Sequence, residues 1–318
     1  MNTAAGALGS VDERVHPADP AVWSWNESWY FSWIDLDGGP VGFFRVGLLP
    51  NQNRAMLWCY VHRDGEWLGT EETRLCFDDF DLADGMAYDR WGLRFGWCPG
   101  SPTARFEFDG SVRTVTGPDA GGLVPLSVRL EATPTTDRFG TGTGHDVGSE
   151  TYPASRFEQS VAVGGTVAFG NEVRDVRAAG HRDRSWGPRD WRVAFTLGDL
   201  QAEHAQLYFV GQPQVGERGG GYLRDASGVR RISSAGGPVH YDDARRTIAP
   251  ARLRFETGDG DVVDVELEPV SPSVSFDMAH TCEDPEHWLY WRILVEARVS
   301  GWPQPVRGWV EASRYGCS

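Results

Sequence analysis

Hydrophobic and polar residues alternate along most of the chain, and this period of two predicts β-strands. In 27–36 (ESWYFSWIDL), Trp29, Phe31 and Trp33 fall on one face and mostly polar residues on the other. The same alternation recurs in 54–69, 104–115, 123–132, 156–180, 190–198, 202–211, 251–269 and 287–312. Helical periodicity is nearly absent, so the chain is predicted to be all-β.

Turn signals between these segments predict hairpins, and their regular spacing predicts barrels or sandwiches. Asp64-Gly65 and Asp109-Gly110 are dipeptides typical of tight hairpin turns. Residues 132–154 are rich in Gly, Thr and Pro and predict a long loop, acting as a lid or a linker. With 318 residues, we expect two antiparallel β domains, 1–178 and 179–318.

Composition narrows the range of functions. The formal net charge is −15, without a basic tract, which argues against a nucleic-acid partner. The chain has no lysine, and this excludes a Walker-type phosphate loop, a Schiff base and pyridoxal phosphate anchoring. Fourteen tryptophans favour strands or an apolar ligand pocket.

The cysteines and the N-terminal sequence indicate a cytoplasmic protein. The five cysteines are an odd number with no C-x-x-C pair, which favours reduced thiols: Cys59, Cys76, Cys98, Cys282 and Cys317. The first twenty residues lack the features of a signal peptide, and no apolar run is long enough to span a membrane. We expect no stable membrane insertion.

The segment 180–191, GHRDRSWGPRDW, concentrates titratable groups at the end of a predicted strand. Alternation places His181, Asp183 and Ser185 on one face, and Arg182, Arg184 and Trp186 on the other. In an apolar pocket the pKa of an aspartate rises, which would make Asp183 a general acid. Arg189 could orient a substrate oxygen through two hydrogen bonds. Alternatively, these groups satisfy one another and serve structure alone.

Aromatic residues elsewhere are candidates for a substrate pocket. Trp29 and Trp33 would either fill the core or line a cavity whose ring faces stabilise a cation. In 202–211, alternation puts His204 and Tyr208 on one side of a strand. Together with Trp191, these four residues are predicted to contact substrate.

Two stretches contain metal-ligand residue types. In 280–288 (HTCEDPEHW), the spacing of His280, Cys282 and His287 matches no common zinc site. The acidic stretch 78–85 lacks the glutamate that closes a calcium loop. We therefore predict no metal and no organic cofactor, and a zinc-dependent hydrolase is the least favoured hypothesis.

Residues 180–189 resemble the pattern Gly-x-Arg-Asp-His-Ser-Trp-Gly-x-Arg of the hydroxyneurosporene synthase/AttH-like superfamily. This superfamily includes the carotenoid 1,2-hydratases and is similar to the lipocalin-like Diels–Alderases. Segments 28–52, 157–176 and 307–316 extend the resemblance over most of the chain. It implies two tandem lipocalin-like (calycin) β-barrels and hydrophobic ligands. It also carries Arg182, Asp183, Trp186 and Arg189 over as pocket residues.

The sequence departs from that pattern at two places. Arg184 replaces the histidine that follows the aspartate, and Tyr208-Phe209-Val210 lacks the acid of a downstream Tyr-x-Asp. A carotenoid hydratase is therefore not expected, and His181 is our candidate for the missing imidazole.

Two functional hypotheses remain. The first is a cofactor-independent enzyme that hydrates, isomerises or cyclises a C=C bond of a terpenoid, steroid or polyketide-like substrate. In it, Asp183, His181 and Arg189 would be catalytic, with Arg182 and Trp186 at the substrate. The second is a non-catalytic carrier or sensor of a lipophilic small molecule. The oligomeric state, including a homodimer, is left open.

Overall fold

The computed structural model describes residues 13–83, 85–98, 101–140, 155–189, 194–211, 219–237, 239–242, 245–276 and 288–315. Across these ranges the regular secondary structure consists of β-strands and three short 3-10 helices, and there is no α-helix. The 3-10 helices are η2 (Pro50–Gln52), η3 (Phe77–Asp79) and η4 (Asp89–Trp91). The predicted all-β class is confirmed. No helix in these ranges is long and apolar enough to cross a membrane.

The described chain forms two compact units. The first contains residues up to 140 together with 155–189, and the second contains 194–315. The boundary expected between 178 and 179 lies inside strand β11 (Glu172–Pro188). This strand pairs with β1 (Trp25–Asp35) as far as Pro188, which explains why the first unit continues to Arg189.

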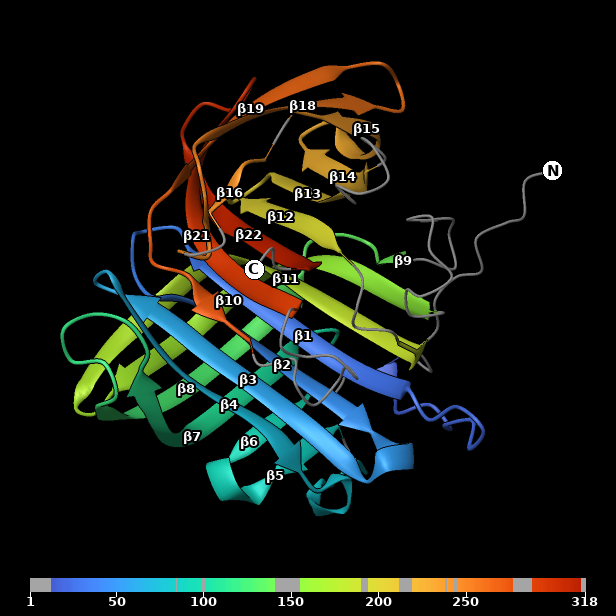
Figure 1. Cartoon of the computed structure of the whole chain (residues 1–318), viewed down its shortest axis with the longest axis vertical. Helices are drawn as coiled ribbons and strands as arrows, with labels where there is room; N and C mark the ends of the chain where they lie inside the picture. The colour runs from blue at the N-terminus through green and yellow to red at the C-terminus, as the bar shows by residue number, and fades with distance from the viewer. Residues whose placement is uncertain are drawn as a thin grey trace. The chain divides into compact units, whose positions relative to one another are not determined.

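The first unit is a closed antiparallel barrel (Figure 1, blue to green). Eight of its described strands form the circuit, because β4 pairs with β7 as well as with β3. Around the barrel they are β4 (Glu66–Leu75), β3 (Arg54–Arg63), β2 (Val41–Leu49), β1, β11, β10 (Ser155–Phe169), β8 (Leu123–Pro134) and β7 (Ala104–Thr114). Three shorter strands extend this sheet: β5 (Met86–Tyr88), β6 (Leu93–Trp97) and β9 (Phe139–Gly140).

The second unit repeats this closure (Figure 1, yellow to red). Its described circuit has eight strands: β19 (Val262–Pro269), β18 (Ala251–Thr257), β15 (Gly228–Gly236), β14 (Gly219–Asp225), β13 (Gln206–Gly211), β12 (Phe195–Gln201), β22 (Val306–Tyr315) and β21 (Trp288–Val299). Pairing of β19 with β21 closes the circuit. Strand β20 (Val274–Ser275) extends the sheet, and β16 (Tyr241–Asp242) pairs separately with β17 (Thr247–Ile248).

The predicted turn at Asp64-Gly65 is confirmed, whereas the one at Asp109-Gly110 is wrong. Asp64 and Gly65 both have positive φ angles, of 49° and 88°, and they join β3 to β4. Strand β7 instead runs straight through Asp109 and Gly110. A Cβ atom on Gly110 would lie 2.9 Å from the ring of Trp91, so glycine is needed there for close packing.

The loop expected at 132–154 begins later than predicted, because 132–134 complete β8. Residues 135–138 then lead to β9, and 141–154 lie outside the described residues. Whether this segment acts as a lid or a linker stays a prediction.

Alternate residues of the barrel strands fill a closed core in each unit. In the first barrel, the Phe44 ring lies fully buried and stacks on Phe106 with 3.7 Å between ring centroids. Phe31 packs against both of these rings. The second barrel has its own core, with Trp291 and Phe255 among its most buried side chains.

Replacing Phe44 with alanine should destabilise the first barrel by about 3–5 kcal/mol, because a buried aromatic ring leaves a cavity behind. Urea unfolding followed by circular dichroism measures this loss. Val173→Ala is the control, since Val173 is 63% exposed and its truncation should cost at most about 0.5 kcal/mol. Equal stability of the two variants would contradict this description of the core.

Candidate functional site

Strand β11 presents two chemically different faces. Arg184 lies opposite Trp29 on β1 and Phe157 on β10, and these side chains point into the barrel. Asp183 lies opposite Tyr30 and Glu158, which point outward. The predicted division of faces is confirmed. It also separates groups that we expected in one pocket: Asp183 and His181 lie on the outer face, while Arg182 and Trp186 lie on the inner one.

Four side chains form a chain of hydrogen bonds and ion pairs, called here the ion-pair chain, on the outer face of β10 and β11. His181 Nε2 lies 2.5 Å from a carboxylate oxygen of Glu158, whose other oxygen pairs with Arg156. Arg156 also donates to Asp183 at 2.6 Å. Asp183 is therefore held by a guanidinium, in contrast to the apolar surroundings that we expected. Glu158 and Arg156 link His181 to Asp183.

Exposure rises steadily along this ion-pair chain. The exposed side-chain fractions are 2% for His181, 5% for Glu158, 9% for Arg156 and 16% for Asp183. Asp183 is thus the most exposed of the four side chains. Beside it, Ser185 hydrogen-bonds Ser28 at 2.6 Å, and Arg189 donates to the Ser185 hydroxyl at 3.4 Å. Arg189 is therefore close to this face, as a group that orients oxygen atoms would need to be.

On the inner face, Arg184 lies in an aromatic and acidic surrounding. Its guanidinium pairs with the buried carboxylate of Glu27 and donates to the carbonyl of Arg14 at 2.6 Å. It also lies 3.9 Å from the ring centroid of Trp29 and 5.5 Å from that of Trp186. Burial lowers the pKa of Arg184, and the Glu27 carboxylate opposes this effect.

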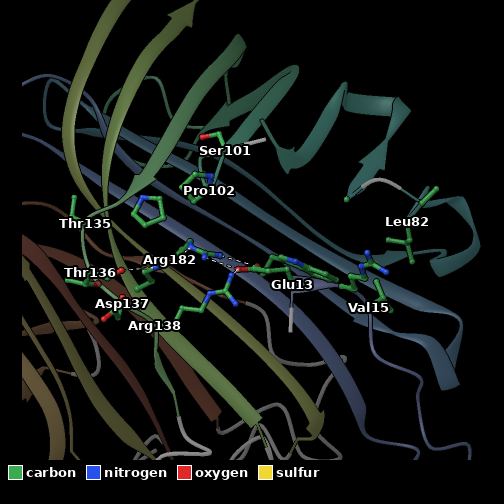
Figure 2. Close-up of a pocket in the computed structure, with 16 residues that line it drawn as sticks. Glu13, Val15, Leu82, Ser101, Pro102, Thr135, Thr136, Asp137, Arg138 and Arg182 are labelled. Carbon is green, nitrogen blue, oxygen red and sulfur yellow. Dashed lines mark hydrogen bonds and ion pairs between the residues drawn. The ribbon is translucent and has the colours of Figure 1, made fainter. Parts of the chain in front are cut away.

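Arg182, the other inward arginine, borders a cavity of 1470 Å³ in the first unit (Figure 2). It donates to both carboxylate oxygens of Glu13, at 2.9 and 3.1 Å. Arg138 pairs with the same carboxylate. Gln159 accepts a hydrogen bond from Arg182 Nε at 2.7 Å, and Trp29 contributes to the cavity wall.

The other residues that were predicted to contact substrate do not lie together in the structure. Trp29 lines the cavity, whereas Trp33 belongs to the core and donates from its indole nitrogen to the carbonyl of Pro40 at 3.0 Å. His204 is exposed in the turn between β12 and β13. Trp191 lies outside the described residues.

Tyr208 belongs to a buried polar network on the second unit. Its ring stacks on Tyr222, which donates to Gln206 at 3.1 Å. Gln206 and Gln201 donate in turn to Asp199, at 2.7 and 2.8 Å. In the same unit, Glu311 pairs with Arg292 and accepts from Tyr290. Of these residues, only Tyr208 was predicted from the sequence.

The carboxylates that neutralise the arginines of β10 and β11 were missed from the sequence. Alternation in 156–160 does place Arg156 and Glu158 on one face, so a signal was present. A two-residue turn, Gly170-Asn171, joins β10 directly to β11, so the pairing of these two strands is also a local feature. Glu13 and Glu27 lie 169 and 157 residues from their arginines.

Within the described ranges, no group of three or more His, Cys, Asp or Glu side chains is placed to hold a metal ion. The stretch 280–287 lies outside those ranges. Cys59, Cys76 and Cys98 are free thiols, and burial raises the pKa of Cys59 to about 12, so it is a core residue rather than a nucleophile.

A family model described as a domain of unknown function, DUF7064, matches residues 9–302. The chain belongs to the DUF7064 family. No curated protein matches the sequence. The solved structures nevertheless include several with the same fold as this DUF7064 protein.

Three of these structures define the fold relationship. A protein assigned as AttH (NE1406) of Nitrosomonas europaea is 16% identical, with a TM-score of 0.60 and coverage of 98% of both chains. CghA in complex with Sch210972 is 14% identical, with a TM-score of 0.56 and coverage of 98% of this chain and 97% of that one. Kievitone hydratase of Nectria haematococca is 11% identical, with a TM-score of 0.56 and coverage of 98% and 94%. The expected similarity to AttH is confirmed at the level of the fold.

Glu27→Gln should destabilise the first unit by about 3–5 kcal/mol, because it leaves the Arg184 guanidinium buried without its carboxylate. The double variant Glu27→Gln/Arg184→Met should lose less than the sum of the two single variants, since the residues are in contact.

Urea unfolding of the four proteins of this cycle measures the coupling between the two residues. Glu266→Gln is the control, because its partner Arg252 is 85% exposed and the pair should contribute at most about 1 kcal/mol. Strict additivity in the cycle would contradict a stabilising Glu27–Arg184 pair.

Proposed function

We propose that this DUF7064 protein is a cofactor-independent enzyme that acts on a C=C bond of a hydrophobic small molecule. The observation that carries the proposal is the ion-pair chain on the outer face of β10 and β11, with Asp183 as its accessible end. Clusters of titratable groups occur at functional sites, and a side chain that transfers a proton must be able to reach the substrate. One structure with the same fold is named a hydratase, which agrees with this chemistry.

The proposed reaction needs one proton donor and acceptor at the substrate. The Asp183 carboxylate accepts a proton from water while the water oxygen bonds to one carbon of the C=C bond, and Asp183 then gives that proton to the other carbon. The carboxylate is regenerated, so the net change is the addition of one water molecule. Without water, the carboxylate takes a proton from a carbon next to the C=C bond and returns it to the far carbon of that bond, and the product is an isomer. Terpenoid, steroid and polyketide-like molecules are the substrate classes we propose.

The remaining residues position Asp183. Arg156 binds its carboxylate at 2.6 Å and is itself held by Glu158. His181 fixes Glu158 from the most buried end. Arg189, which donates to Ser185 beside Asp183, is proposed to orient a substrate oxygen.

A carrier of lipophilic molecules is the second candidate function. The observation in its favour is the 1470 Å³ cavity of the first unit, which is large enough for a small-molecule ligand. A carrier would release its ligand unaltered, whereas the enzyme would change it.

Asp183→Asn should fold normally and lose at least about 100-fold in turnover, because the amide cannot exchange the proton. Native mass spectrometry of the purified protein, followed by solvent extraction, identifies a bound ligand. That ligand and a lipid extract of the expressing cells are then incubated with fresh protein. A mass increase of about 18, or an isomer with a new retention time, reports turnover.

Asp109→Asn is the matched control. Asp109 also accepts from an arginine, Arg129, at 2.7 Å, but this pair is exposed on β7 and β8. The Asp109→Asn variant should keep wild-type turnover. Full turnover by Asp183→Asn would refute the role of Asp183, and ligands returned unaltered by the wild-type protein would favour the carrier.

A further inference from the structure

Two arginines of the first unit converge on a single carboxylate beside the cavity. Arg182 binds both oxygens of Glu13, and Arg138 pairs with one of them (Figure 2). Arginine typically recognises a carboxylate in this way, with two N–H groups of one guanidinium donating to the two carboxylate oxygens. We propose that this arginine pair is the binding site for the carboxylate of an amphipathic small molecule, and that Glu13 occupies the site when no ligand is bound.

Contacts that do not involve Glu13 hold the two arginines in place. Gln159 accepts from Arg182 Nε at 2.7 Å and donates to the carbonyl of Thr136 at 2.8 Å. Both guanidinium groups lie over the ring of Phe157, at 5.0 Å for Arg182 and 4.8 Å for Arg138. The pair is therefore preorganised for an anion, which reduces the entropic cost of binding one.

Glu13 is attached to the molecule differently from the arginines. Arg182 belongs to β11, whereas residues 13–24 precede β1 and form no strand. A side chain on such a segment can leave its partners without breaking a ladder of backbone hydrogen bonds. Glu13 can therefore be exchanged for a ligand more easily than Arg182 can move.

The charge of the cavity wall favours an anionic ligand. Among the residues that line the cavity, Arg14, Arg138 and Arg182 are cationic, and Glu13 and Asp137 are anionic. Cations thus exceed anions in this wall, although the whole chain has a net charge of −15. Burial and the charge of Arg138 lower the pKa of Arg182, so a bound carboxylate stabilises its charged form.

The rest of the cavity suits the apolar body of such a ligand. Its wall includes the apolar side chains of Val15, Trp29, Leu82, Pro102 and Pro134. A carboxylate at Arg182 would leave the body of the molecule against these groups. The arginine pair lies on the inner face of β11, so that binding there does not depend on turnover at Asp183, which lies on the outer face.

The test uses the full-length protein and two fluorescent probes, 11-(dansylamino)undecanoate and its methyl ester. Both have the same apolar body, and only the acid has a carboxylate. Glu13→Gln should bind the acid about tenfold more tightly than wild type if Glu13 fills the site about nine-tenths of the time. Affinity for the ester should stay the same. Adding Arg138→Gln to the Glu13→Gln variant should abolish the preference for the acid. Adding Arg129→Gln instead should leave the preference unchanged, because Arg129 is an exposed arginine on another strand.

A second measurement separates binding from a purely structural role of Glu13. Glu13→Gln should lower the melting temperature, because it leaves two arginines without their carboxylate. The acid probe should restore part of this loss and the ester should not. If Glu13 only neutralises the arginines, neither probe will restore it.

Each remaining outcome decides the proposal. Equal affinities for acid and ester in all variants would refute a carboxylate site. Absence of binding in folded variants, judged by circular dichroism, would refute a ligand site in the cavity. If Glu13→Gln does not fold, the comparison is made between the wild-type protein and Arg138→Gln. The proposal then requires that the wild-type protein binds the acid more tightly than the ester and that Arg138→Gln does not. Equal binding of the acid and the ester by the wild-type protein would overturn the proposal.

Discussion

Residues 178–186 of β11 are paired on both edges, with β1 on one side and β10 on the other. Because the two ladders occupy the backbone hydrogen-bonding groups, each side chain can point only into the barrel or away from it. This constraint divides the charged run of the strand. Arg182 and Arg184 enter the barrel, and His181 and Asp183 stay on its outer face.

Because the two arginines are buried, each requires a carboxylate nearby, and these carboxylates come from other parts of the chain. Glu27 of β1 pairs with Arg184, and Glu13 of the N-terminal segment pairs with Arg182. On the outer face, Glu158 and Asp183 surround Arg156. A buried charge without such a partner would cost several kcal/mol. The absence of lysine fits this arrangement, because the planar guanidinium can bind two oxygens and stack on an aromatic ring at once.

We propose a different role for each face of β11. The outer face contains a graded chain of ion pairs that ends at Asp183, the proposed site of proton transfer. The inner face borders a cavity with an arginine pair and apolar walls, the proposed site for an amphipathic acid. Similarity to AttH, CghA and kievitone hydratase establishes the fold, and the assignment of chemistry to this chain rests on its own side chains.

The sequence by itself determined the all-β class and the division of His181, Arg182, Asp183 and Arg184 between two faces. Both follow from the local geometry of a strand, whose side chains alternate whatever the strand packs against. A local signal failed at Asp109-Gly110, where packing against Trp91 and not a turn requires the glycine.

Only the tertiary structure decided which carboxylate each arginine meets and where the first unit ends. Glu27 and Arg184 are 157 residues apart in the chain, and the register between β1 and β11 brings them together. That register depends on closure of the whole barrel and on burial of its core. No local pattern of residues contains this information, because the interactions that set the register form between segments distant in sequence.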